Sequence, residues 1–142
     1  MKLDQIFSVS LIYATFRSAT PIIYAALCAA ITQQADILNI GTEGIMLMGA
    51  FTAVAVSYMS GSWLMGILVA MAAGFVMAGI MALAHIRYKA EICAIGMGIN
   101  LFALAITKFM LNVIFGTRGT FSDPAICPIP RVHLPFLEKI PV

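Results

Sequence analysis

The most constraining feature of the sequence is a run of 41 residues without a charged side chain, between Glu43 and His85. An ordinary soluble domain has about a quarter of its residues charged, whereas this chain has 10% charged and 62% hydrophobic residues. As one helix the run would be about 60 Å long, twice the ~30 Å thickness of the bilayer hydrocarbon. We therefore expect it to cross a membrane twice, with a break at Ser60-Gly61-Ser62.

The other apolar runs predict two further spans, so the expected fold is an all-α integral membrane protein. The four expected spans are Ser18–Ala35, Gly44–Met59, Trp63–Ile86 and Ile92–Phe115. Residues 3–16 are apolar enough to lie along the membrane interface or to lengthen the first span. Residues 116–142 hold five of the six prolines and predict an extended loop or tail outside the hydrocarbon. We treat residues 1–142 as a single transmembrane domain.

Residues suited to catalysis or metal binding are few in this sequence. It contains no catalytic or phosphate-binding motif of the common kinds. His85 and His133 have no partner ligand at metal spacing, and the three cysteines lack CxxC spacing, which is typical of small buried hydrophobic residues. We therefore expect no enzymatic activity, no metal and no cofactor. The net charge of +2 is too small to indicate nucleic-acid binding.

Small residues recur every four positions on two of the expected helices, and such stripes let helices approach closely in lipid. On the third span these residues are Gly66, Ala70, Gly74, Ala78 and Ala82, and on the second they are Gly49, Ala53 and Ser57. The pattern favours helix packing within the chain over an interface between subunits.

Two polar residues of the fourth span, Asn100 and Thr107, are seven positions apart and so share one face of the helix. One interpretation is that this face lines a polar pathway between helices. The other is hydrogen bonding between helices, which is common in membrane bundles. Both interpretations stay open at this point.

The segment LNIGTEGIML, residues 38–47, sets a carboxylate among glycines and apolar residues. A helix that begins near Thr42 would be capped by that side chain, and Glu43 in its first turn would add about 0.3–1 kcal/mol. Alternatively, the glycines allow irregular backbone at membrane depth, where transporters bind substrates or hinge. We predict a structural hinge near a translocation path, formed by Asn39, Gly41, Glu43 and Gly44.

Five segments occur in an order and spacing that resemble a known family: ATPIIYAAL (19–27), LNIGTEGIMLMGAF (38–51), IRYKAEICAIGMGINLFAL (86–104), FGTRGTFSDPAI (115–126) and LPFLEKIP (134–141). The chain is similar to the permease subunits of bacterial ABC importers for nucleosides and simple sugars. The chain departs from the family pattern at three places. Thr32-Gln33-Gln34 replaces a Ser-Glu-Arg-like stretch, Asp36 replaces a glycine, and Thr42 replaces an aliphatic residue.

The resemblance implies a multi-pass protein of the bacterial cell (inner) membrane that catalyses no covalent chemistry itself. Its expected partners are an ATP-binding cassette ATPase subunit, a second permease subunit and an extracytoplasmic substrate-binding lipoprotein. The resemblance places the N-terminus and the proline-rich loop outside, and His85–Lys89 in the cytoplasm. The dense basic charge of that loop agrees, although a count of all Lys and Arg outside the spans favours the opposite orientation.

Members of the family are considerably longer than this chain. We therefore expect the N-terminal half of a permease, incomplete as it stands, for an importer of nucleosides or simple sugars. The alternative is a small helical membrane scaffold or accessory subunit without a translocation path of its own.

Overall fold

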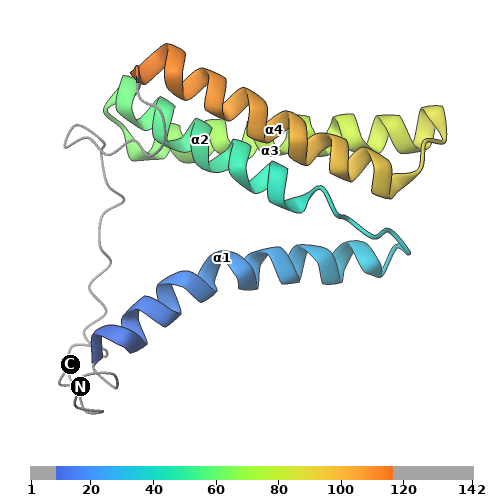
Figure 1. Cartoon of the computed structure of the whole chain (residues 1–142), viewed down its shortest axis with the longest axis horizontal. Coiled ribbons are helices and arrows are strands. Elements are labelled where there is room, and N and C mark those ends of the chain that lie inside the picture. Colours follow the sequence, from blue (N-terminus) through green and yellow to red (C-terminus); the bar gives the residue numbers. More distant parts are fainter. Residues whose placement is uncertain (1–8, 117–142) are drawn as a thin grey trace.

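The computed structural model describes residues 9–116 of the chain (Figure 1). They form the helices α1 (Val9–Gln33), α2 (Thr42–Ser60), α3 (Trp63–Tyr88) and α4 (Ile92–Phe115). All four helices are long and apolar enough to cross a membrane. The predicted all-α membrane fold is therefore confirmed for this part of the chain. The predicted loop at residues 117–142, and residues 3–8 of the predicted interfacial segment, lie outside the described residues.

Two helices are longer than the sequence predicts. α1 begins at Val9, so residues 9–16 are helical and continuous with the first span. α3 continues to Tyr88, so most of the basic stretch predicted as a loop is the last helical turn. The His85 ring Nδ1 lies 3.0 Å from the carbonyl oxygen of Ala90, in the turn that leads to α4. Basic side chains are favourable here because the C-terminal end of a helix carries partial negative charge.

The predicted break between the second and third spans is confirmed. α2 ends at Ser60, and Gly61 has a left-handed φ of 62° and donates its N–H to the carbonyl of Ser57 at 3.0 Å. This conformation is strained for residues with a Cβ but not for glycine, which explains why the turn occurs at this position.

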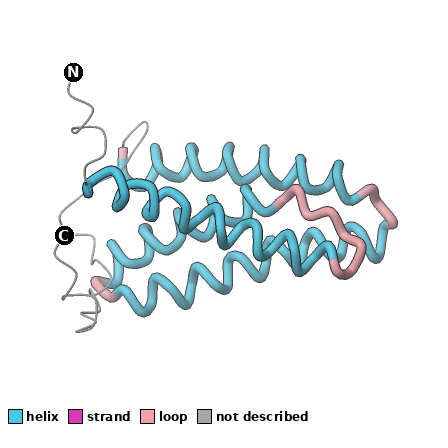
Figure 2. Tube along the Cα trace, turned by 90° about the horizontal axis from the view of Figure 1, so that it is seen from below, coloured by secondary structure: helices cyan, strands magenta, loops and turns pink. Residues whose placement is uncertain are grey.

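Helices α2, α3 and α4 pack together, and α2 contacts α3 most extensively (Figure 1). Figure 2 shows the helices running along a roughly common direction with the loops at the two ends. The core of the three helices is small and includes Met77, Met81, Ile99 and Ala103. Large apolar side chains elsewhere are exposed, for example Phe75 at 80% and Leu101 at 70%. Such extensive apolar surface is expected of helices that face lipid.

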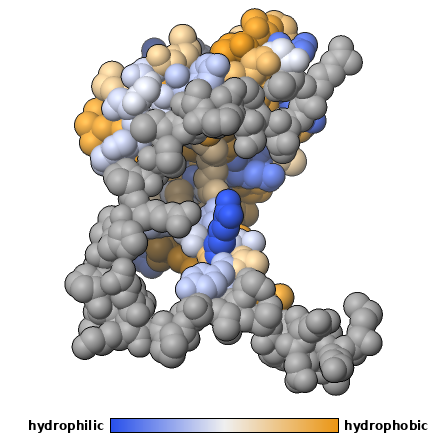
Figure 3. Space-filling view, turned by 90° about the vertical axis from the view of Figure 1, so that its left-hand side faces the viewer, coloured by the Kyte–Doolittle hydropathy of each residue, from blue (hydrophilic) through white to orange (hydrophobic). Residues whose placement is uncertain are grey.

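Helix α1 lies apart from the other three and makes its helix contacts with α2 alone. None of its described side chains is buried. In Figure 1 it runs beneath the other helices and joins α2 through residues 34–41. Figure 3 views the molecule from the end at which α1 begins, where apolar and polar residues are mixed on the described surface. Such a mixture suits the boundary between membrane and water.

The turn after α1 contains Asp36, which has a left-handed φ of 58°. Its N–H donates to the carbonyl of Gln33 at 3.0 Å, and the N–H of Ile37 donates to the carbonyl of Thr32 at 3.2 Å. These bonds close the C-terminal end of α1 in the manner of a left-handed cap. Glycine adopts this conformation without a steric penalty, so the glycine expected here from the family resemblance has a structural explanation.

Candidate functional site

The start of α2 lies against α4, at a point well inside the length of that helix. It contacts Asn100, which is eight residues, or about 12 Å, beyond the first residue of α4. The whole of α4 has 24 residues and is about 36 Å long. If α4 is centred on a hydrocarbon core about 30 Å thick, α2 would begin within the core and not at its surface. Residues 34–41, which are not helical, would then carry their backbone into the core.

Asn100 forms hydrogen bonds with the backbone on both sides of the start of α2. Its Oδ1 accepts from the N–H of Gly44 at 2.7 Å, and its Nδ2 donates to the carbonyl of Ile40 at 3.0 Å. The first N–H groups of a helix have no partner within that helix, and unpaired backbone groups are costly in lipid. A single side chain from α4 thus satisfies one donor and one acceptor. Of the two interpretations open from the sequence, the geometry shows interhelical hydrogen bonding for Asn100.

Three glycines bring the backbones of the two segments together. A Cβ on Gly44 would lie 2.8 Å from the Cα of Asn100, and one on Gly96 would lie 2.9 Å from the backbone nitrogen of Gly41. Real Cβ contacts are almost never this short. The φ of Gly41 is −72°, which any residue adopts, and Gly44 is helical. These glycines therefore serve close approach and not backbone freedom, and a hinge role for residues 39–44 stays a prediction.

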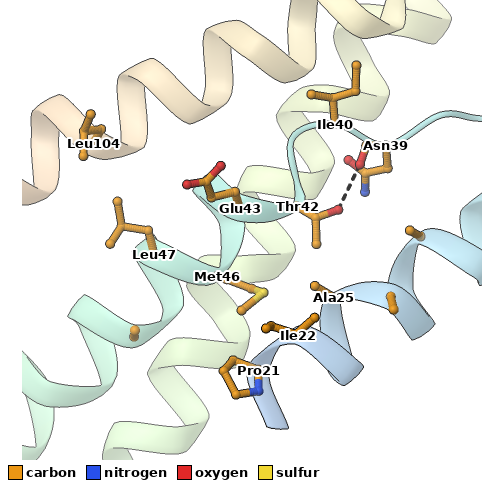
Figure 4. Close-up of a pocket in the computed structure, with 13 residues that line it drawn as sticks. Pro21, Ile22, Ala25, Asn39, Ile40, Thr42, Glu43, Met46, Leu47 and Leu104 are labelled. Carbon is orange, nitrogen blue, oxygen red and sulfur yellow. Dashed lines mark hydrogen bonds between the residues drawn. The ribbon is translucent and has the colours of Figure 1, made fainter. Parts of the chain in front are cut away.

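The prediction that Thr42 caps α2 is wrong. The N-cap position is Gly41, which has no side chain to offer, and Thr42 is already the first helical residue. The Thr42 hydroxyl donates backwards, to the carbonyl of Asn39 at 3.0 Å (Figure 4). The Asn100 amide caps the helix in its place. Glu43 does lie in the first turn, as expected, where the partial positive charge of the helix end favours a carboxylate.

A groove of about 800 Å³ lies between α1 and the start of α2. Its walls are mostly apolar, and Leu104 of α4 contributes to them (Figure 4). The polar residues that line it are Asn39, in the segment before α2, and Thr42 and Glu43, in the first turn of α2. The Glu43 side chain is exposed, and among residues 9–116 its carboxylate has no hydrogen-bond or ion-pair partner. The Oδ1 atom of Asn39 is buried and likewise lacks a hydrogen-bond partner within the described part of the chain.

Small residues of the predicted stripes on α2 and α3 lie against the neighbouring helix at several levels. A Cβ on Gly66 would lie 2.8 Å from the carbonyl oxygen of Ala53. One on Gly49 would lie 4.0 Å from the carbonyl oxygen of Ala70, and Gly74 is also within contact distance of α2. For this part of the stripe, the geometry shows packing within the chain.

The remaining predicted residues lie away from the groove. Ala78 and Ala82 are exposed and line a smaller cavity of about 190 Å³, which Asn39 also reaches. Thr107 is buried, and its hydroxyl donates to the sulfur of Met48 at 3.6 Å. Asn100 and Thr107 both face α2, as their spacing predicts, and neither is among the residues lining the groove. A path-lining role for them stays a prediction.

Two residues at this contact, Gly96 and Ile40, were not predicted from the sequence. Gly96 is buried and precedes Asn100 by four positions, which places both on one face of α4. That spacing was visible in the sequence. Ile40 contributes through its backbone carbonyl. Because every residue has this group, the side chain of Ile40 could not indicate the contact. No cluster of His, Cys, Asp and Glu suited to a metal ion is found within residues 9–116.

Comparison of the sequence with known proteins identifies the family of this chain. The protein family described as "Branched-chain amino acid transport system / permease component" matches residues 11–135, which is most of the chain. The chain belongs to this permease family. As a family member whose residues 9–116 form four helices long and apolar enough to cross a membrane, it is a multi-pass protein of the cell membrane.

Individual relatives of this permease chain extend the comparison. It is 36% identical to the guanosine ABC transporter permease protein NupQ of Bacillus subtilis, over 100% of this chain and 46% of the relative. It is 32% identical to a provisionally named glucose ABC transporter permease protein of Haloferax volcanii, over 94% of this chain and 38% of the relative. It is 32% identical to the nucleoside ABC transporter permease protein NupC of Lactococcus lactis, over 87% of this chain and 40% of the relative.

The permease chain thus spans less than half the length of these relatives. No solved structure matches it.

Proposed function

We propose that this chain forms part of the translocation path of an ATP-driven importer for nucleosides or simple sugars. The relatives named above support the solute class, since two are named for nucleosides and one for glucose. In this proposal the chain catalyses no covalent chemistry. ATP hydrolysis belongs to a partner ATPase, a second permease completes the path, and an extracytoplasmic binding lipoprotein delivers the solute.

The observation that carries the proposal is the start of α2 against Asn100, eight residues inside α4, beside a groove with polar residues at one end. Broken or late-starting helices supply polar backbone and side chains near the middle of a bilayer, where transporters bind solutes. Irregular backbone at that depth is tolerated only when it is buried in protein or lines an aqueous cavity. Here Asn100 satisfies part of that backbone, and the groove lies on the other side of the segment.

The predicted orientation of the chain in the membrane indicates on which side the polar end of the groove would lie. If the turn between α3 and α4 faces the cytoplasm, the polar end of the groove lies in the cytoplasmic half of the membrane. The 39–44 segment would then be the part of the chain that changes position between inward-facing and outward-facing states. Its close packing on α4 gives such a movement a defined resting position.

Uptake of radiolabelled guanosine and glucose tests the proposal, in cells that express the chain with and without its partner proteins. We expect uptake of one solute that requires this chain, the ATPase and ATP together. Absence of uptake with every partner set would refute the transport role. If the chain then still assembled stably with a partner, the alternative of a helical scaffold without a translocation path would be favoured.

A further inference from the structure

Asn39 opposes the position that the structure shows for the segment leading into α2. Its Oδ1 atom is buried and has no hydrogen-bond partner among residues 9–116. The Thr42 hydroxyl donates to the backbone carbonyl of Asn39 at 3.0 Å and leaves this side-chain atom unpaired. A buried polar atom without a partner is unfavourable, because the hydrogen bond that it forms with water is lost and not replaced. Because Oδ1 is enclosed, water reaches it only if the segment or the side chain moves.

Asn100 favours the same position. Its Oδ1 accepts from the N–H of Gly44 at 2.7 Å, and its Nδ2 donates to the carbonyl of Ile40 at 3.0 Å. Within the described part of the chain, these are the only hydrogen bonds that join residues 39–44 to another helix. The segment thus depends on one side chain for its polar contacts with α4, and both bonds break when the segment leaves that helix.

Free volume borders the segment. Asn39 lines both the groove of about 800 Å³ and the cavity of about 190 Å³. The cavity wall includes Met81, whose unbranched side chain adapts easily to changes in its surroundings. Protein interiors are otherwise closely packed and resist movement. The start of α2 therefore has room to move away from α4, and such a movement would bring the Asn39 amide to water.

We propose that residues 39–44 form a two-position element, balanced between a closed position on α4 and an open position in which the first turn of α2 is released. Asn100 stabilises the closed position, and the unpaired Oδ1 of Asn39 destabilises it. The two contributions are of similar size, since an unpaired buried group is about as unfavourable as two hydrogen bonds between membrane helices are favourable. A partner or solute that binds one position better therefore shifts the balance easily. This inference rests on the proposed transport function and names Asn39 and Asn100 as positioning residues for its movement.

Hydrogen exchange of the Ile45 amide measures this balance in the chain in lipid nanodiscs. Its N–H donates to the carbonyl of Gly41 at 3.1 Å, a bond that opens with the first turn of α2 and involves neither asparagine. Mass spectrometry with fragmentation to single residues follows the exchange. The N–H of Gly61, bonded to the carbonyl of Ser57 at the other end of α2, is the internal reference. A change at Ile45 without a change at Gly61 identifies a local effect.

Asn39→Leu replaces the unpaired amide with an apolar side chain of similar size. It should slow exchange at Ile45 about tenfold, the factor that corresponds to about 1.4 kcal/mol and to relief of one unpaired buried group. Asn39→Ala, which cannot overpack the site, should change the exchange in the same direction. Gln34→Leu, which removes an exposed amide from the same connection, should leave it unchanged. Faster or unchanged exchange in both Asn39 variants, or equal slowing by Gln34→Leu, would overturn the proposal.

Asn100→Leu should speed exchange at Ile45. The double variant with Asn39→Leu should lie between the two single variants, since both residues act on one equilibrium. Changes in the same direction for the two single variants would contradict their opposing roles. The measurement does not depend on uptake. Uptake without these opposing effects leaves the transport function standing and refutes the two-position element, whereas opposing effects without uptake refute the transport function alone.

Discussion

Gly96→Ala and Gly98→Ala place the same methyl group on the same helix two residues apart, and the structure predicts effects of opposite sign. A Cβ on Gly96 would lie 2.9 Å from the backbone nitrogen of Gly41 and 3.2 Å from the Cβ of Ile40. A Cβ on Gly98 would meet nothing within 4 Å. The pair therefore isolates the contact between α4 and the start of α2.

The expected magnitudes follow from three contributions. Both substitutions gain about 1 kcal/mol of helix propensity, because alanine is a better helix former than glycine. At Gly96 the backbone of residues 40–41 must move, and overpacking of this kind costs about 1–3 kcal/mol. That movement also stretches the 3.0 Å bond from Asn100 to Ile40, and hydrogen bonds between membrane helices are worth about 0.6 kcal/mol and at most about 1.7. We expect Gly96→Ala to be destabilising by about 1–3 kcal/mol and Gly98→Ala to be stabilising by up to about 1 kcal/mol.

The free energy of unfolding is measured by titrating the protein in mild detergent with sodium dodecyl sulfate. Far-UV circular dichroism follows helix content, and the single tryptophan, Trp63, gives an independent fluorescence signal. Effects of the same sign and size for the two variants would refute the close contact between Gly96 and Gly41.

Three further predictions test other contacts. Asn100→Leu should reduce the free energy of unfolding by about 1–3 kcal/mol because it leaves two backbone groups unpaired. Asn112→Leu, at an exposed position, should change it by less than about 0.5 kcal/mol. Equal effects would contradict the two hydrogen bonds from Asn100 to Gly44 and Ile40. Gly66→Ala should weaken the packing of α2 on α3 by about 1–3 kcal/mol, whereas Gly79→Ala, with nothing within 4 Å of its Cβ, should not, as the same titration will report. The pKa of Glu91 lies below its ordinary value because its carboxylate accepts hydrogen bonds, chiefly from the N–H of Ala94 and also from the N–H of Cys93. The ionised carboxylate therefore stabilises the fold above the ordinary pKa, and this stabilisation is lost as pH falls through the lowered pKa. The free energy of unfolding, measured at a series of pH values, should fall in this way in the unmodified chain and not in Glu91→Gln. An identical pH dependence in the two proteins would refute the contribution of Glu91.

The number, type and approximate position of the helices could be predicted from the sequence, because burial in hydrocarbon acts on each span separately. A long uncharged run must be helical in lipid, and the break at Ser60-Gly61-Ser62 divides the longest run locally. The ends of α1 and α3 were less well predicted. Apolar residues 9–16 and the basic residues after His85 are compatible with helix or interface, and the neighbouring segments decide between them.

The candidate site could be predicted only in part. The segment 39–44 was singled out because a carboxylate and glycines are unusual in an apolar run, and the structure places that segment beside a groove. The same local reasoning assigned the cap of α2 to Thr42, which was wrong. Asn100, which is 56 residues from Gly44 in the sequence, supplies the cap because α4 packs against that helix end.

The sequence by itself determined that this chain is a helical membrane protein and that the segment around Glu43 is exceptional. The reason is that lipid hydrocarbon requires every span to be apolar and helical. A polar residue within such a span is therefore easily recognised in the sequence. Only the tertiary structure decided that Gly41, Gly44 and Gly96 meet, and that Asn100 pairs with backbone 56 and 60 residues away. Helix pairing depends on which surfaces fit closely once the spans are formed, and that complementarity is not encoded in any one local pattern.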